Sequence, residues 1–100
     1  MNSISALELY HRLHLNEDIV LIDVRTSSER EEYHIGGLHL PLDEILEHIS
    51  LIPKDKSVVI YCRKGIRSMI AIQRIQQKLD YQNVFNLQGG IDAWKKITNK

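Results

Sequence analysis

The sequence has little or none of several features that would narrow its function. Cys62 is the only cysteine among 100 residues, so no disulfide can form within the chain, and a lone thiol suits a reducing compartment. No apolar run approaches the roughly 20 residues of a membrane span. The stretch MNSISALELYHRL lacks the basic start and apolar run of a signal peptide. We therefore expect a cytoplasmic protein that does not associate with a membrane.

An excess of charge of one sign is also absent. The 13 Lys and Arg residues balance 13 Asp and Glu residues, which gives a formal net charge of zero. A chain with this balance is not expected to bind nucleic acid as a whole, so any anion-binding site must be local. Repeats and low-complexity tracts are missing too, and the length leaves room for one core. We expect residues 1–100 to form a single domain and the protein to be a monomer.

The sequence does contain an alternation of strand-like and helix-like segments. Apolar runs at residues 19–22 and 57–62 are typical of strands buried on both faces of a parallel sheet, and residues 83–87 predict a third strand. Spacing and capping predict helices in residues 5–14, 27–33, 42–52, 66–80 and 91–97. The second of these helices would take Ser27 or Ser28 as its N-cap. The alternation predicts an α/β fold with a central, mostly parallel sheet flanked by helices on both faces.

Two polar stretches follow the two strongest predicted strands. Ligands of parallel sheets bind beyond the carboxyl ends of the strands, where the chain enters the next helix. The stretch DVR, residues 23–25, follows the first strand, and CRKGIRS, residues 62–68, follows the second. The fold and the chemistry therefore indicate the same edge of the sheet.

The loop after Cys62 has the composition of an anion-binding turn. Gly65 allows a backbone conformation that other residues resist, and successive N–H groups in such a turn can point inward. The helix that follows adds the partial positive charge of its N-terminus. Arg63, Lys64 and Arg67 add full charges. These features all stabilise a thiolate relative to a thiol, and the thiolate is the nucleophile.

A plainer interpretation treats Cys62 as a small buried apolar side chain and the basic residues as a solvated helix start. Two observations count against it. Helix N-termini favour Asp and Glu over cations. The chain makes that ordinary choice elsewhere, because residues 27–32, SSEREE, place acids at another predicted helix start.

A metal centre is not expected. With one cysteine, a site for a soft metal would also need histidines. The histidines are scattered along the chain, at His11, His14, His34, His39 and His48. We therefore expect no metal and no cofactor.

Four motifs, taken in order, resemble those of the single-domain rhodanese family of sulfurtransferases. They are LIDVR (residues 21–25), SSEREEYHIGGLHLPLDEI (27–45), VVIYCRKGIRS (58–68) and VFNLQGGIDAWKK (84–96). The resemblance runs almost end to end. It implies an α/β fold with a central parallel sheet and a double-displacement reaction without a cofactor. Cys62 would take the outer sulfur of a small anionic donor such as thiosulfate, and cyanide, a thiol or a cysteine of a partner protein would remove it.

The resemblance also implies roles for the loop. Cys62 would be the nucleophile and persulfide carrier. The cradle around its sulfur would be formed by Arg63, Lys64, Gly65, Ile66, Arg67 and Ser68. Arg63 and Lys64 stand at variable positions and resemble the cationic choice of enzymes that use thiosulfate, a dianion. Arg67 would pair with an acid that braces the loop.

Three residues outside the loop are expected to support it. Asp23 and Glu29 are candidates for the acid that pairs with Arg67, and the offset of Glu29 from DVR matches the acid of the family. Arg25 would serve structure or lie at the rim of the pocket. A simple ion pair between Asp23 and Arg25 explains both residues equally well. Trp94 is expected to lie in the core.

The segment that flanks the pocket departs from the family pattern. Arg30 stands where an aromatic residue is usual, Tyr33 replaces a Gly, and Gly36 replaces a Pro. The stretch HIGGLHLP is also one residue shorter than the common form. These changes leave the cysteine loop intact and put the substrate preference of the pocket in question.

Two alternative functions are open to a chain with this pattern. Related phosphatases and some arsenate reductases on this fold use Cys-x5-Arg, whereas Cys62 and Arg67 form the shorter Cys-x4-Arg, which suits one sulfur atom. A non-enzymatic or regulatory interaction module is the other alternative, although such modules typically lack the cysteine. Because no second cysteine is available, a sulfur acceptor must come from outside the chain.

Overall fold

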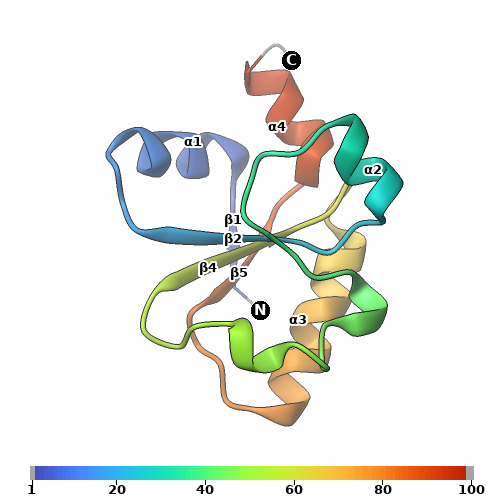
Figure 1. The fold of residues 1–100 in the computed structure, drawn as a ribbon. Helices are drawn as coiled ribbons and strands as arrows, with labels where there is room; N and C mark the ends of the chain where they lie inside the picture. The colour runs from blue at the N-terminus through green and yellow to red at the C-terminus, as the bar shows by residue number, and fades with distance from the viewer. Residues whose placement is uncertain (1, 99–100) are drawn as a thin grey trace.

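The computed structural model of the protein describes residues 2–98, and its centre is a five-stranded parallel sheet (Figure 1). Its strands are β1 (Ser3–Ile4), β2 (Ile19–Asp23), β3 (Leu38–His39), β4 (Ser57–Tyr61) and β5 (Val84–Leu87). They lie in the order β1-β5-β4-β2-β3, and every neighbouring pair is parallel. The central strands match the three predicted ones, while the two-residue edge strand β1 was not predicted.

Helices cover both faces of this sheet, as Figure 1 shows. They are α1 (Ala6–His14), α2 (Ser27–Glu32), α3 (Ile66–Lys78) and α4 (Gly90–Thr98). Helices α1 and α4 lie together on one face, and α3 lies on the other face with the segment between β3 and β4. The predicted fold class is therefore confirmed.

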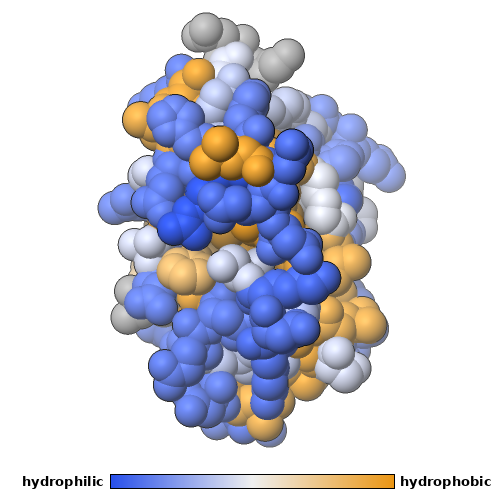
Figure 2. Space-filling model, turned by 90° about the vertical axis from the view of Figure 1, so that its left-hand side faces the viewer, coloured by the Kyte–Doolittle hydropathy of each residue, from blue (hydrophilic) through white to orange (hydrophobic). Residues whose placement is uncertain are grey.

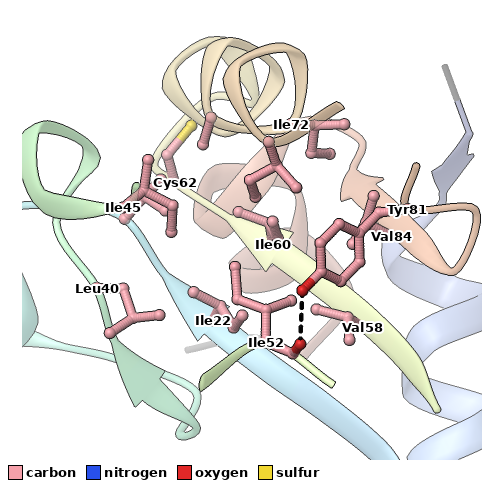
Figure 3. Packing of buried hydrophobic residues seen from close by; sticks show 13 residues of the cluster. Ile22, Leu40, Ile45, Ile52, Val58, Ile60, Cys62, Ile72, Tyr81 and Val84 are labelled. Carbon is pink, nitrogen blue, oxygen red and sulfur yellow. Dashed lines mark hydrogen bonds between the residues drawn. The ribbon is translucent and has the colours of Figure 1, made fainter. Parts of the chain in front are cut away.

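The strand β4 shows why the sheet is buried on both sides. Its side chains alternate between the faces, and Cys62 continues the alternation just beyond the strand. Val58, Ile60 and Cys62 belong to the cluster under α3, which Figure 3 shows, whereas Val59 and Tyr61 belong to the cluster under α1 and α4. Each of these five side chains is at most 1% exposed. The side chain of Cys62 therefore lies on the face of the sheet that α3 covers.

The predicted helix over residues 42–52 was wrong. The structure has two short 3-10 helices there, η1 (Leu42–Glu44) and η2 (Ile49–Leu51), joined by turns. Hydrogen bonds span three residues, for example from Ile45 N to Leu42 O and from Ile52 N to Ile49 O. Side chains three apart lie on one side of a 3-10 helix, so these apolar residues reach the core without an α-helix. The apolar spacing alone could not separate the two helix types.

Side-chain hydrogen bonds identify the N-cap residues of α1 and α2. Ser5 caps α1, since its hydroxyl accepts a hydrogen bond from Glu8 N at 3.1 Å. Thr26, rather than Ser27 or Ser28, is the N-cap of α2. Thr26 and Glu29 form a capping box in which each side chain bonds to the backbone N–H of the other residue. The cap prediction for α2 was therefore one or two residues too late.

The register of the sheet gathers the strand ends that carry polar residues. Asp23 is paired with Tyr61, so the DVR stretch and the cysteine loop begin at the same level of neighbouring strands. These carboxyl ends lie on the right of Figure 1.

The surface on the left-hand side of that view is largely hydrophilic, with separate apolar patches (Figure 2). Among residues 2–98, no helix has the length and apolar character needed to cross a membrane.

Candidate active site

The sulfur of Cys62 lies in a cradle of backbone N–H groups. Gly65 N donates to Cys62 Sγ at 3.1 Å, and Ser68 N donates to it at 3.3 Å. Gly65 is the N-cap of α3 and has φ of +94°, in the left-handed region that glycine adopts without strain. Ser68 is in the first turn of α3, where N–H groups have no carbonyl partner within the helix. The predicted turn, and the helix start at Ile66, are confirmed.

A shallow depression of about 160 Å³ opens over this sulfur. It is lined by Cys62, Arg63, Lys64, Ile66 and Arg67. Arg63 and Lys64 are exposed, while Cys62 itself is buried. Arg63 is also held by an ion pair of 3.4 Å with Asp92 at the start of α4. The cations thus surround the mouth of the depression, and the sulfur lies at its base.

Arg67 braces the cysteine loop through an ion pair with Glu29. Its two terminal nitrogens donate to the two carboxylate oxygens of Glu29 at 2.7 and 2.8 Å. The hydrogen bond from Arg67 lowers the pKa of Glu29 to about 2, and the same pair raises the pKa of Arg67. Glu29 also completes the capping box of α2. One carboxylate therefore ties the cysteine loop to the neighbouring helix.

Asp23 and Arg25 form a separate buried ion pair. Asp23 Oδ1 accepts from Arg25 Nε at 2.9 Å, and Oδ2 accepts from Nη2 at 3.0 Å. Burial alone would lower the pKa of Arg25, but the hydrogen bond and charge of Asp23 outweigh it and raise the pKa. Arg25 Nη2 also donates to the carbonyl of Tyr33 at 2.6 Å. Of the two acids expected to pair with Arg67, Glu29 forms that ion pair, whereas Asp23 pairs with Arg25.

Side chains of Arg30 and Tyr61 hold the turn that contains Gly36 and Gly37. Arg30 donates to Gly37 O at 2.8 Å and approaches Asp23 Oδ2 at 3.4 Å. Tyr61 donates its hydroxyl to Gly36 O at 2.9 Å. Burial raises the pKa of Tyr61 to about 12, so its phenol stays a donor at neutral pH. Arg30, at a position where the family resemblance led us to expect an aromatic residue, thus stabilises this segment by hydrogen bonds.

The turn before α4 holds the back of the cysteine loop. Ile91 N donates to Cys62 O at 2.9 Å, and Asp92 N donates to Arg63 O at 3.0 Å. Gly90 makes this approach possible, because a Cβ on it would lie 2.3 Å from Cys62 O. The glycines of the QGG stretch therefore belong to the site, although they lie far from Cys62 in the sequence.

A larger cavity of about 450 Å³ adjoins the loop between α2 and α4. Its lining includes Arg25, Glu29, Tyr33, Arg63, Asp92 and Lys95. It shares Arg63 with the depression over Cys62. Trp94, which was expected in the core, is half-buried against the cluster under α1 and α4. Most of the residues that line the cavity are charged, and Tyr33 and Ile91 connect the cavity to that cluster.

Sequence reasoning missed Asn86 in β5. Its side-chain amide donates to Gly65 O at 3.1 Å, and its side-chain oxygen accepts from the hydroxyl of Ser68. That hydroxyl lies 3.4 Å from Cys62 Sγ. The available signal was one polar residue inside the apolar run VFNL. A buried polar side chain needs hydrogen-bond partners, but the sequence could not identify them.

One group of potential metal ligands is present in residues 2–98. The donor atoms of Glu44, Glu47 and His48 lie within 4.8 Å of one another. The two carboxylates are exposed, and the three residues belong to the 3-10 segment rather than to the cysteine loop. Nothing in their geometry connects them with the chemistry of Cys62.

Comparison with known proteins agrees with this geometry. Residues 5–97 match the family described as Rhodanese-like domain. A sulfurtransferase of Allochromatium vinosum is 43% identical over 97 residues, which cover 96% of this chain and 90% of that protein. The thiosulfate sulfurtransferase GlpE of Coxiella burnetii is 37% identical over 93 residues, 92% of this chain and 85% of that protein.

Solved structures place the fold in the same group. A rhodanese-related protein of Thermoplasma volcanium has a TM-score of 0.84 at 26% identity, and the match covers 97% of this chain and 93% of that one. A rhodanese-like domain protein of Staphylococcus aureus also has a TM-score of 0.84, at 27% identity, with 94% and 91% covered. A parallel sheet that ends in a cysteine loop, together with these matches, shows that the chain belongs to the rhodanese-like domain family.

Proposed function

We propose that this protein is a sulfurtransferase that moves a sulfane sulfur through a persulfide on Cys62, with thiosulfate or a similar anion as the donor. The observation that carries the proposal is the cradle around Cys62 Sγ, which receives N–H groups from Gly65 and Ser68 beneath a mouth lined by cations. Two relatives with 43% and 37% identity are a sulfurtransferase and a thiosulfate sulfurtransferase, which supports the transfer of sulfur and thiosulfate as a donor.

The reaction would proceed in two displacements. The Cys62 thiolate attacks the outer sulfur of thiosulfate, so a new S–S bond forms, the S–S bond of thiosulfate breaks, and sulfite leaves with the electron pair. An acceptor nucleophile then attacks the outer sulfur, and Cys62 departs as a thiolate. A thiol acceptor becomes a persulfide, and cyanide becomes thiocyanate. The sulfur is passed on without an external oxidant or reductant.

The chain's own groups would assist each displacement. Arg63 and Lys64 lie at the mouth, where a dianionic donor must approach. Backbone N–H groups and the start of α3 stabilise negative charge on the sulfur. Arg67 contributes by holding the loop through Glu29. The cavity beside Arg63 offers space for the body of an acceptor.

Loop size argues against a phosphatase or arsenate reductase. Four residues separate Cys62 from Arg67, and Arg67 is already bound to Glu29 on both of its terminal nitrogens. Arg67 lines the depression over Cys62, but its terminal nitrogens are engaged by Glu29. A non-enzymatic module is disfavoured because the cysteine and its donors are all present.

Intact-mass spectrometry after incubation with thiosulfate tests the proposal. We expect a single adduct of one sulfur atom to form with release of sulfite, and dithiothreitol or cyanide should then remove the adduct. Cys62→Ser should show neither the adduct nor formation of thiocyanate. Thr98→Ala, a change at the far end of α4, serves as a control and should keep both. Hydrolysis of aryl phosphates without a sulfur adduct would overturn the assignment.

A further inference from the structure

Asn86 is a buried polar residue in the apolar strand β5, beside the cysteine loop. It pairs with Ile60 of β4 in the sheet register, and it is 9% exposed. Alternation along the strand sends Val84 and Asn86 toward the face that carries α3. A carboxamide buried there is unfavourable unless its hydrogen-bonding groups are satisfied.

The two ends of the Asn86 amide can be assigned from their partners. Its Nδ2 lies 3.1 Å from the carbonyl oxygen of Gly65, which can only accept. The side-chain oxygen must therefore face the other partner, Ser68. It accepts a hydrogen bond from the Ser68 hydroxyl. The orientation of this amide is thus fixed by the cysteine loop itself.

This assignment also determines where the Ser68 hydrogen points. A hydroxyl group has one hydrogen, and here Asn86 receives it. The oxygen of Ser68 consequently presents a lone pair to Cys62 Sγ, which is 3.4 Å away. A Cys62 thiol can donate its S–H to that lone pair. A thiolate cannot, and it would face a lone pair without a hydrogen.

We propose that Asn86 is a positioning residue that makes the Ser68 hydroxyl a two-position switch. In the resting thiol, the hydroxyl hydrogen lies on Asn86. When Cys62 loses its proton to solvent, the hydrogen turns toward the sulfur, and Asn86 loses that donor. Asn86 therefore competes with the thiolate for one hydrogen bond and favours the thiol at rest. Any effect of this switch on sulfur transfer rests on the proposed function, whereas the switch itself depends only on the ionisation of Cys62.

Charged side chains also lie on the cysteine loop itself and on the elements packed around it. They are Arg63, Lys64 and Arg67 of its own loop, Asp23, Arg25 and Glu29 from β2 and α2, and Asp92 from α4. The variants below leave all of these unchanged. A change in ionisation can then be assigned to the Asn86–Ser68 pair.

The pH dependence of Cys62 alkylation by iodoacetamide, followed by intact mass, tests the switch. Asn86→Ala releases the Ser68 hydrogen to the sulfur, so we expect the midpoint of the rate profile to fall by about half to one pH unit. That is about three- to tenfold more thiolate at a pH below the midpoint. Asn83→Ala is the matched control. Asn83 lies just before β5, and its side-chain amide also donates to backbone carbonyls, those of Pro53 and Lys56, but not to the cysteine loop. The midpoint of this variant should not move.

A double-mutant cycle separates the switch from general loosening of the loop. In a Ser68→Ala background, Asn86→Ala should cause no further shift. An unchanged or higher midpoint in the single variant, or shifts that add, would overturn the proposal. Should Asn86→Ala not fold, Asn86→Asp replaces it, and its carboxylate should raise the midpoint; a fall would contradict the switch. Alkylation needs no sulfur donor, so a failed sulfur-transfer assay leaves this test readable.

Discussion

At the scale of single residues, the cations of the cysteine loop have different tasks. Arg67 is fixed on Glu29, and Arg63 is partly held by Asp92. Lys64 makes no salt bridge within residues 2–98, and it is exposed at the mouth of the depression. Lys64 is therefore the cation that can respond to the charge of an incoming donor.

Lys64→Ala should weaken the use of thiosulfate more than the use of a sulfane sulfur donor with an uncharged tail. We expect kcat/KM for thiosulfate to fall about three- to fivefold at low ionic strength, since one exposed charge contributes up to about 1 kcal/mol. Added salt should shrink the difference from wild type. Lys78→Ala, at the last turn of α3, is the control and should leave kcat/KM unchanged. Equal losses with both donors would refute the electrostatic role of Lys64.

At the scale of elements, the start of α4 acts as the rear support of the cysteine loop. Its first N–H groups bind the carbonyls of Cys62 and Arg63, and this contact leaves no space for a side chain at Gly90. The loop geometry thus depends on a turn that follows a different strand. Substitution at that turn should disturb both stability and chemistry.

Gly90→Ala should lower the free energy of unfolding by about 3 kcal/mol or more, because backbone strain adds to a steric clash. It should also abolish formation of the sulfur adduct. Gly36→Ala is the matched control: Gly36 also has positive φ, of +95°, but a Cβ there meets nothing within 4 Å. We expect that variant to lose about 1 kcal/mol and to keep the adduct. Urea unfolding and intact mass measure both effects, and equal behaviour of the two variants would contradict the support role.

The elements also show how far the sequence could predict the structure. The turn at Gly65 was predictable because the strand, glycine and helix start that define it are adjacent in sequence. The 3-10 segment was not, since apolar spacing of three and four residues fits both helix types. Thr26, Ser27 and Ser28 are all of residue types that cap helices, and only the hydrogen bonds between Thr26 and Glu29 identify the N-cap of α2.

At the scale of the whole molecule, contacts distant in sequence were predictable only where a family pattern supplied them. Glu29 was one of two acids, with Asp23, expected to pair with Arg67, which lies 38 residues from Glu29 in the sequence. Asn86 had no such guide, because its role depends on the register of β4 and β5 and on where α3 begins. The candidate nucleophile and its loop could therefore be predicted from the sequence, whereas the residues that support the loop, such as Asn86, could be identified only from the structure.

The Glu29–Arg67 pair also makes the stability of the whole domain depend on pH. The pKa of Glu29 is lowered from 4.5 to about 2 in the folded protein. The stabilisation is therefore complete above the unfolded pKa and is lost as the pH falls from about 4.5 toward 2. Both side chains are about one-third exposed, so solvent screening reduces the effect to about 1–2 kcal/mol.

Glu29→Gln isolates this charge, because Gln at the third position of α2 can still complete the capping box with Thr26. We expect the variant to be about 1–2 kcal/mol less stable than wild type between pH 6 and 8. The difference should narrow below pH 4.5 and vanish near pH 2. Urea unfolding across this range measures it, with Glu31→Gln as the exposed control on the same helix. A difference that stays constant down to pH 2 would show that Glu29 stabilises the domain through its shape and not through its charge.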